Sequence, residues 1–140
     1  MAKITVTPTP GFKYRLDIDT GKYQLVADQP SSVGGADGGP DPKELALAGL
    51  GACTAQTILM VAPQRNWDIQ ELIVKVSIAY QNDPTAGGNT KLPVITEEIE
   101  VKGNLTPNEL DAIKRVAGKC PIYKLFVGSK RIDTSVVKTG

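Results

Sequence analysis

The stretch PDPKELALAGLGACTAQTILMVAPQRN, residues 40–66, predicts one long apolar helix with clear signals at both ends. Asp41 is suited to the N-cap, Pro42 to the first helical position, and Glu44 to position N3 of a capping box. No further charged residue occurs before Pro63, where the helix is expected to end after about 20 residues. A helix that is apolar all round is typical of a protein interior, so we expect it to form the centre of the fold.

The same length and lack of charge would also suit a membrane span. Small and polar residues dilute the hydrophobicity of the segment, namely Gly49, Gly51, Thr54, Gln56 and Thr57. The rest of the chain has the pattern of a soluble α+β domain. We therefore predict a buried core helix and no membrane partner.

Residues before this helix predict a small antiparallel meander followed by a loop. Apolar and polar side chains alternate in three short segments, which are Lys3–Thr7, Phe12–Ile18 and Tyr23–Ala27. A turn over Asp19–Lys22 separates the last two segments. Residues 28–40, DQPSSVGGADGGP, form a loop of a length that is typical of functional or mobile segments.

Residues after the helix predict further strands and helices. The expected elements are strands over Leu72–Tyr80 and Ile95–Lys102, helices over residues 106–118 and 121–126, and a closing strand over Ile132–Val137. A second loop, Gln81–Pro93, separates the two long strands, and Thr106 opens a second capping box. No internal repeat and no linker divides the chain, which indicates a single α+β domain over residues 1–140.

The composition excludes several classes of protein. The chain has 140 residues, a formal net charge of +1, two cysteines and no histidine. Sites that need imidazole, such as Ser-His-Asp or Cys-His sites, are therefore excluded within one chain, and a zinc site would lack half its ligands. A charge near zero argues against nucleic-acid binding. We expect no metal and no cofactor.

The N-terminal residues MAKITVTPTPGF lack the apolar core of a signal peptide. A cytoplasmic and thiol-reducing environment is therefore expected. In such a compartment two cysteines are more often reactive or simply buried than joined in a structural disulfide.

The two cysteines lie far apart in the sequence and in different settings. Cys53 lies in the middle of the apolar helix, whereas Cys120 directly precedes Pro121 and is expected to be the N-cap of a short helix. A free cysteine often only fills space in a core. Alternatively, a thiolate attacks a peroxide to give a sulfenic acid, and a second thiol condenses with it to a disulfide. That scheme needs neither histidine nor metal.

Four segments together resemble the OsmC/Ohr family of thiol peroxidases. They are GGADGGPDPKEL at residues 34–45, GLGACT at residues 49–54, ITEEIEV at residues 95–101 and KCPI at residues 119–122. The family pattern is a glycine-rich loop, a Pro-x-Glu-Leu helix start, an Ala-Cys or Ser-Cys step, a later strand and a Cys-Pro-Val/Ile motif. The order of these elements agrees over most of the chain.

The resemblance implies an α+β fold with curved antiparallel sheets around a long buried central helix, in an intertwined homodimer with active sites at the subunit interface. It implies that Cys53 is the peroxidatic nucleophile and Cys120 the resolving thiol. The implied substrates are organic hydroperoxides. The implied reductant is a dithiol, such as dihydrolipoamide on a lipoylated protein.

The sequence departs from the best-characterised members of the family at three positions. Those enzymes place an activating Arg in the first hairpin turn, which we equate with Asp19–Lys22, so that Thr20 falls near the expected Arg. Their Glu falls at Lys43, and Glu44 is one residue later, a rotation of about 100° on a helix. Tyr123 occupies a position at which members often carry His.

A positive charge is still needed beside a reactive Cys53. The candidates are Arg15, Lys22, Lys43 and Arg65, and they could act from the other subunit of a dimer. We take Arg15 and Glu44 as the further candidate catalytic residues. Arg15 could instead be a solvated surface residue, and Glu44 could serve only in the capping box.

Two other functions remain open at this point. The departures from the Arg and Glu positions favour a non-catalytic dimer that binds a hydrophobic small molecule in the apolar groove around the central helix. A third interpretation is a redox sensor that forms the disulfide but turns over slowly. Retention of both cysteine motifs favours the peroxidase.

Overall fold

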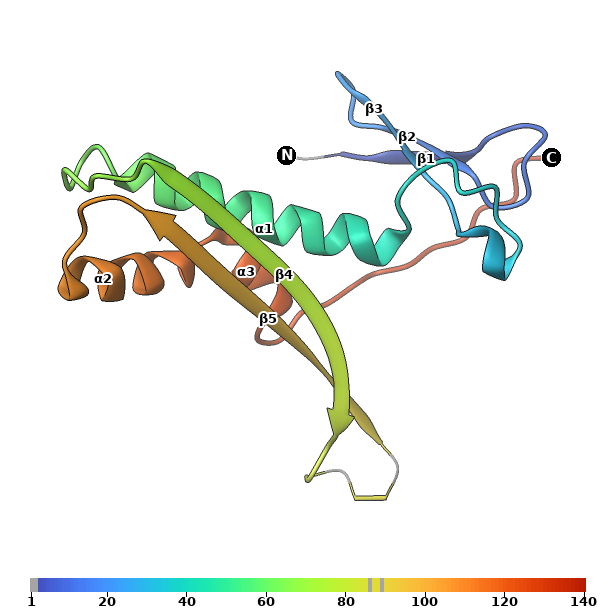
Figure 1. The fold of residues 1–140 in the computed structure, drawn as a ribbon. Helices are drawn as coiled ribbons and strands as arrows, with labels where there is room; N and C mark the ends of the chain where they lie inside the picture. The colour runs from blue at the N-terminus through green and yellow to red at the C-terminus, as the bar shows by residue number, and fades with distance from the viewer. Residues whose placement is uncertain (1–2, 86, 89) are drawn as a thin grey trace. The chain divides into compact units, whose positions relative to one another are not determined.

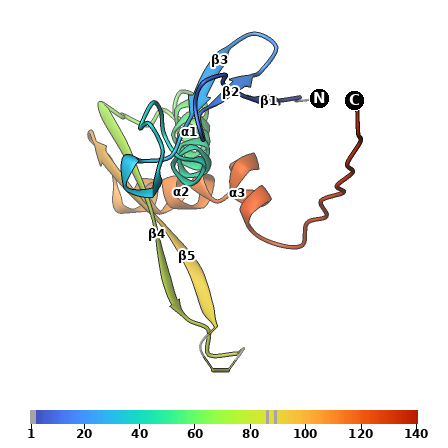
Figure 2. The same cartoon turned by 90° about the vertical axis from the view of Figure 1, so that its right-hand side faces the viewer.

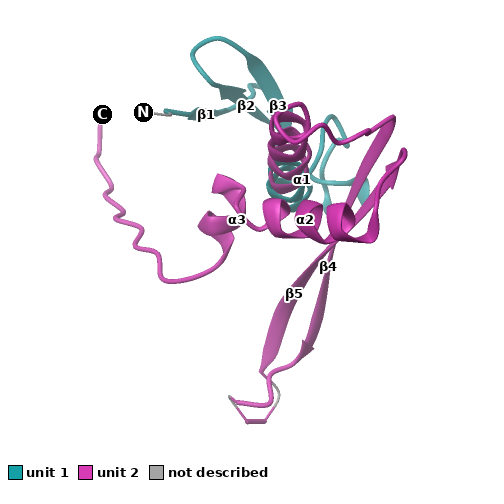
Figure 3. Cartoon of the chain, turned by 90° about the vertical axis from the view of Figure 1, so that its left-hand side faces the viewer, with its two compact units in different colours: residues 1–49 teal, residues 50–140 magenta. Residues whose placement is uncertain are grey.

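The computed structural model describes residues 3–85, 87–88 and 90–140, and the chain divides into two compact units. Residues 1–49 form one unit and residues 50–140 the other, with the boundary inside helix α1 (Pro42–Val61), as Figure 3 shows. Each unit contains its own antiparallel sheet. The expectation of a single domain over residues 1–140 stays a prediction.

The first unit contains a three-stranded antiparallel sheet in the order β1-β2-β3 (Figure 1). Its strands are β1 (Thr5–Pro8), β2 (Leu16–Asp19) and β3 (Gln24–Ala27). The predicted meander is therefore confirmed, but its second strand is shorter than the alternation over Phe12–Ile18 suggested. Thr9 instead donates its backbone N–H to the Arg15 carbonyl at 2.9 Å, which closes a loop.

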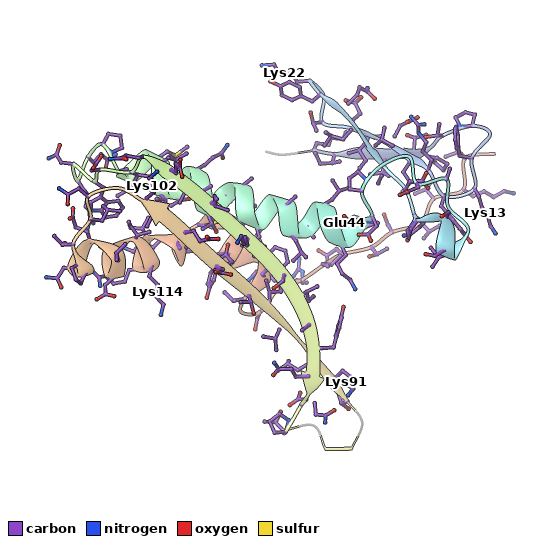
Figure 4. All side chains as sticks on the ribbon, viewed as in Figure 1. Lys13, Lys22, Glu44, Lys91, Lys102 and Lys114 are labelled. Atoms are coloured by element: carbon purple, nitrogen blue, oxygen red, sulfur yellow. The ribbon has the colours of Figure 1, made fainter. Side chains whose placement is uncertain are left out.

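This loop changes the assignment of the hairpins. The first hairpin joins β1 to β2 through residues 9–15, and the turn at Asp19–Lys22 joins β2 to β3. Figure 4 shows Lys13 and Lys22 at opposite ends of this sheet. The sequence-based identification of Asp19–Lys22 as the first hairpin turn was wrong, because residues 12–14 do not pair. The first hairpin loop contains Arg15.

The glycine-rich loop that follows β3 is folded around a buried carboxylate. Asp28 is 2% exposed and accepts the backbone N–H groups of Gln29 at 2.7 Å and Gly38 at 3.0 Å. The N–H groups of Gly38 and Gln29 hold the pKa of Asp28 below its usual range. The loop also contains a short 3-10 helix, η1 (Ser31–Val33). It therefore has a defined structure.

The second unit is built on a long curved hairpin, visible in Figures 1 and 2. Strands β4 (Glu71–Asn82) and β5 (Lys91–Lys102) pair along their whole length, from Glu71 opposite Lys102 to Asn82 opposite Lys91. Strand β5 starts earlier than the predicted Ile95 because Lys91, Leu92 and Pro93 also pair. On the polar face Lys75 forms an ion pair with Glu100 at 2.6 Å.

The core of the second unit joins α1, α2 (Pro107–Ala117) and the hairpin. Its buried residues are Ile58, Ala62, Trp67, Ala112, Ile113 and Val116. The predicted capping box of α2 is confirmed, because Thr106 accepts the Glu109 N–H and Glu109 accepts the Thr106 N–H. Gly118 is the C-cap, and α3 (Pro121–Phe126) follows.

The predicted strand over Ile132–Val137 does not form. Residues 129–140 have no regular secondary structure, and Ile132 is 88% exposed and Val136 94% exposed. A strand satisfies its backbone N–H and C=O groups through a neighbour. No strand of the described part of the chain pairs with this segment.

Helix α1 has the predicted extent but buries little of its apolar surface within one chain. Leu50, Thr54 and Ile58 are buried, whereas Leu59 and Met60 are more than half exposed. The helix is long and apolar enough to span a membrane, with a mean hydropathy of 1.5, and only 17% of that window is buried. Much of the apolar surface of α1 is therefore exposed in the single chain.

Candidate active site

The second unit brings together both cysteines, which the sequence places far apart. Cys53 lies in α1 and is partly buried, whereas Cys120 is fully buried at the start of α3. Both thiols are free, and the two side chains are linked by a hydrogen bond. The tertiary structure therefore brings the two thiols together.

Local sequence explains the position of Cys120. Pro121 occupies the first turn of α3, and Cys120 adopts extended backbone angles as the N-cap. Its Sγ accepts the backbone N–H of Tyr123 at 3.4 Å, which is the usual bond of an N-cap side chain. The prediction that Cys120 caps a short helix is confirmed.

The surroundings shift the pKa values of the two thiols in opposite directions. Burial raises the pKa of Cys53, but hydrogen bonds from the Cys120 thiol, the Ile122 backbone N–H and the Thr57 hydroxyl outweigh it and lower that pKa overall. Burial and the hydrogen bond to Cys53 raise the pKa of Cys120. Of the two thiols, Cys53 is therefore the one that loses its proton more readily. This is the division of roles expected of a nucleophile and a resolving thiol.

A carboxylate that the sequence analysis did not single out also belongs to the site. Glu97 Oε1 accepts the hydroxyl of the fully buried Thr54 at 2.6 Å, and Thr54 follows Cys53 in α1. The negative charge of Glu97 raises the pKa of Cys53, against the hydrogen bonds. The alternation of β5 could have identified this residue, because it places the charged Glu97 on the same face as the apolar Ile95 and Ile99.

A cavity of about 460 Å³ adjoins this site. Its walls come from α1, β5, α2, α3 and the residue after α3, and its lining is Leu50, Pro93, Ile95, Glu97, Ile99, Lys114, Ala117, Gly118, Tyr123, Phe126 and Val127. Most of these side chains are apolar. The size falls in the range of small-molecule sites, about 300–1,000 Å³.

The two further candidates, Arg15 and Glu44, belong to the first unit. Glu44 forms the predicted capping box with Asp41: the Glu44 N–H donates to Asp41 Oδ1 at 2.8 Å, and Glu44 Oε1 accepts the Asp41 N–H at 3.2 Å. The guanidinium of Arg15 lies over the Phe12 ring, 5.0 Å from its centroid. Arg15 Nε is buried and has no hydrogen-bond partner among the described residues.

The remaining cationic candidates contact aromatic rings or lie at helix ends. Lys22 lies over the Tyr23 ring at 5.4 Å, and Arg65, just after α1, lies over Trp67 at 5.8 Å. Lys43 lies in the first turn of α1. In the part of the chain that the structure describes, no group of three or more Cys, Asp or Glu residues could hold a metal ion.

These features define a class of protein: an α+β protein in which two free thiols meet, one on a long apolar helix and one at the N-cap of a short helix. The family model described as OsmC-like protein matches residues 34–135. The chain therefore belongs to the OsmC-like family. No curated protein matches the chain by sequence.

Solved structures agree with this assignment. An OsmC-like protein from Mycoplasma pneumoniae is 22% identical and aligns over 90% of this chain and 86% of that chain, with a TM-score of 0.72. An organic hydroperoxide resistance protein OsmC from Legionella pneumophila is 21% identical over 91% and 90% of the two chains, with a TM-score of 0.66. OhrB of Bacillus subtilis, an organic hydroperoxide resistance protein, is 22% identical over 91% of each chain, with a TM-score of 0.62.

The comparisons confirm the predicted fold class, an OsmC-like fold of helices and antiparallel sheets. They also identify α1 as the core helix of that fold and not as a membrane span. At these sequence identities the solved structures establish the fold alone. The chemistry of the site is inferred from the residues of this chain.

Proposed function

We propose that the protein is a cysteine-based thiol peroxidase that reduces organic hydroperoxides. The observation that carries the proposal is the hydrogen-bonded pair of Cys53 and Cys120, in which the lowered pKa belongs to the more accessible sulfur. A thiolate is the attacking form of cysteine, and a second thiol close to it can condense with the sulfenic acid to form a disulfide. The family, and relatives named organic hydroperoxide resistance proteins, support the same activity.

The proposed reaction uses only these two thiols and two external reactants. The Cys53 thiolate attacks the terminal oxygen of the hydroperoxide, the O–O bond breaks, and after protonation the products are an alcohol and the Cys53 sulfenic acid. The Cys120 thiol then attacks that sulfur, a disulfide forms and water leaves. A dithiol reductant, such as a lipoylated protein, restores both thiols by exchange and becomes a disulfide itself.

Arg15 is the proposed source of positive charge at Cys53, and Glu44 stays a candidate catalytic residue. The carboxylate on which the charge of Arg15 acts within the chain is Asp28, whose pKa it helps to lower. Arg15 lies in the first hairpin loop, where the resemblance places the activating Arg. Its buried Nε lacks a hydrogen-bond partner among the described residues, so it has capacity to bind another group. We propose that Arg15 reaches Cys53 of the other subunit in a homodimer.

The proposed homodimer rests on apolar surface that one chain leaves uncovered. The exposed residues include Leu59 and Met60 of α1 and Ile132, Val136 and Val137 of the C-terminal segment. Hairpin β4–β5 is also a two-stranded sheet, which is marginally stable on its own. An intertwined partner would cover both features, and we propose a cytoplasmic dimer.

Met60→Glu is expected to convert the dimer to monomers, since a charge at the centre of an apolar interface is strongly disfavoured. Size-exclusion chromatography with light scattering measures the mass directly. Asn108→Glu, on the exposed first turn of α2, is the matched control and should stay dimeric. A wild-type protein that is monomeric at micromolar concentration would contradict the proposed dimer.

The peroxidase proposal is tested by adding stoichiometric cumene hydroperoxide to the reduced protein and measuring its intact mass. A loss of about 2 Da, the two thiol hydrogens, shows the disulfide. Thiols that stay unreacted after long exposure would refute the activity. Repeated turnover with dihydrolipoamide then separates an enzyme from a redox sensor that reacts once.

Cys120→Ser is expected to stop the reaction at the oxidised Cys53. Without a resolving thiol, the sulfenic acid persists or is oxidised further to the sulfinic acid, a gain of about 16 or 32 Da. Dimedone labelling followed by peptide mass spectrometry locates the sulfenic acid. If this variant forms no oxidised species, the assignment of the two roles is wrong.

The cavity supports a second candidate, a non-catalytic dimer that binds a hydrophobic small molecule. Apolar residues line most of its walls, and its volume suits such a ligand. This function would leave the thiols unreactive towards hydroperoxide while an apolar fluorescent probe binds to the protein. Reactive thiols favour the peroxidase, with the cavity as the site for the organic part of its substrate.

A further inference from the structure

Glu97 is a charged residue on the apolar face of β5. Its neighbours on that face, Ile95 and Ile99, line the cavity, whereas Glu98 and Glu100 lie on the opposite face with Lys75. Placing a carboxylate among apolar side chains costs free energy unless hydrogen bonds compensate. The bond from Thr54 to Glu97 Oε1, at 2.6 Å, provides one of them.

This bond fixes the carboxylate beside the dithiol pair. Thr54 is fully buried in α1 and directly follows Cys53, so the bonded carboxylate is held close to the nucleophile. The cavity wall that includes Glu97 also includes Tyr123, whose backbone N–H bonds to Cys120 Sγ. Glu97 therefore adds negative charge at a wall of the cavity, and this charge acts on Cys53.

The charge of Glu97 is not neutralised by an ion pair within the described residues. The other charged residue of the lining is Lys114, which α2 contributes. Lys114 is exposed, and the ion pairs among the described residues do not join it to Glu97. Tyr123 from α3 is the other titratable residue of the lining.

We propose that Glu97 is a specificity-determining residue, which disfavours anionic reactants at Cys53 and so selects hydroperoxides with no charge near the peroxide group. The proposal rests on Cys53 being the nucleophile of the proposed function. The bonded carboxylate lies close enough for its charge to act on the Cys53 sulfur. An anion that approaches Cys53 is therefore repelled by Glu97, and a neutral hydroperoxide of the same shape feels no such repulsion. The substrate class is thus narrowed to organic hydroperoxides that carry no negative charge near the peroxide group.

The test compares iodoacetate with iodoacetamide, two probes of similar shape that differ in charge. Both alkylate the thiolate, so the ratio of their rates cancels any change in the amount of thiolate. Peptide mass spectrometry follows the reaction at Cys53 in the reduced full-length protein. Glu97→Gln keeps a side-chain oxygen to accept the Thr54 hydroxyl and removes the charge.

Glu97→Gln should raise the ratio of iodoacetate to iodoacetamide rates by at least about threefold to tenfold, the effect of two unit charges about 4 Å apart in a water-like dielectric. Glu98→Gln, the adjacent residue on the opposite face, is the matched control and should leave the ratio unchanged. The wild-type ratio should rise with added salt, which screens Glu97, and this dependence should weaken in Glu97→Gln. An unchanged ratio in Glu97→Gln, or an equal rise in Glu98→Gln, overturns the proposal.

Matched hydroperoxides extend the comparison to the proposed reaction. Cumene hydroperoxide should oxidise wild-type Cys53 faster than its 4-carboxylate derivative, and Glu97→Gln should reduce the difference. If neither hydroperoxide reacts while the alkylation ratio still responds to Glu97→Gln, the peroxidase assignment fails and the discrimination against anions at Cys53 stands. If both react and Glu97→Gln leaves their relative rates unchanged, Glu97 does not determine specificity.

Discussion

Cys53→Ser is expected to abolish reaction with organic hydroperoxides, with no disulfide and no oxidised species after stoichiometric cumene hydroperoxide. A serine hydroxyl does not ionise near neutral pH and does not form a stable oxidised product with a peroxide. Cys120 cannot take over, because it is fully buried and its pKa is raised. The expected loss is therefore complete, to the level of the uncatalysed reaction.

Intact mass and peroxide consumption measure this loss, and circular dichroism checks that the variant is folded. Ala55→Ser, which adds a hydroxyl to the same helix at a partly buried position, is the matched control and should keep full reactivity. Peroxide consumption by Cys53→Ser at the wild-type rate would show that Cys53 is not the nucleophile.

Ile58→Ala is expected to have the largest effect on stability among the predictions. Ile58 is completely buried in the cluster that joins α1 to α2 and Trp67. Truncating a buried Ile to Ala costs about 2–5 kcal/mol, the lost transfer free energy plus the cavity left behind. That is a large share of the roughly 5–15 kcal/mol typical of natural domains.

Urea denaturation measures the change in the free energy of unfolding. Leu110→Ala, at a residue of α2 that is 44% exposed, should cost about 1 kcal/mol or less because less apolar area is lost from contact. If the two variants lose equal stability, the core of the second unit is not where the structure places it.

Several features followed from local sequence alone. The capping boxes at Asp41–Glu44 and Thr106–Glu109, and the N-cap role of Cys120 before Pro121, depend on residues at most three positions apart. The extent of α1 and the alternation in β4 and β5 depend on periodic patterns within one segment. Such short-range rules operate whatever the rest of the chain does.

Other features depend on which segments meet. Phe12–Tyr14 alternates like a strand but lies in the loop that brings Arg15 into the first hairpin, because β1 pairs with residues 16–19 instead. Ile132–Val137 also alternates, but it lacks a partner strand within the described chain. An alternating pattern specifies which side chains share one face of a strand, but it does not specify which other strand pairs with it.

The sequence by itself determined the apolar helix, its caps and the N-cap position of Cys120, since each depends on residues close together in the chain. It also determined the family resemblance, which depends on the identity and order of short motifs. Only the tertiary structure decided that Cys53 meets Cys120 and that Glu97 is bonded beside them. It also lowered the pKa of one thiol and raised that of the other, because burial and hydrogen bonds between distant segments exist only after folding.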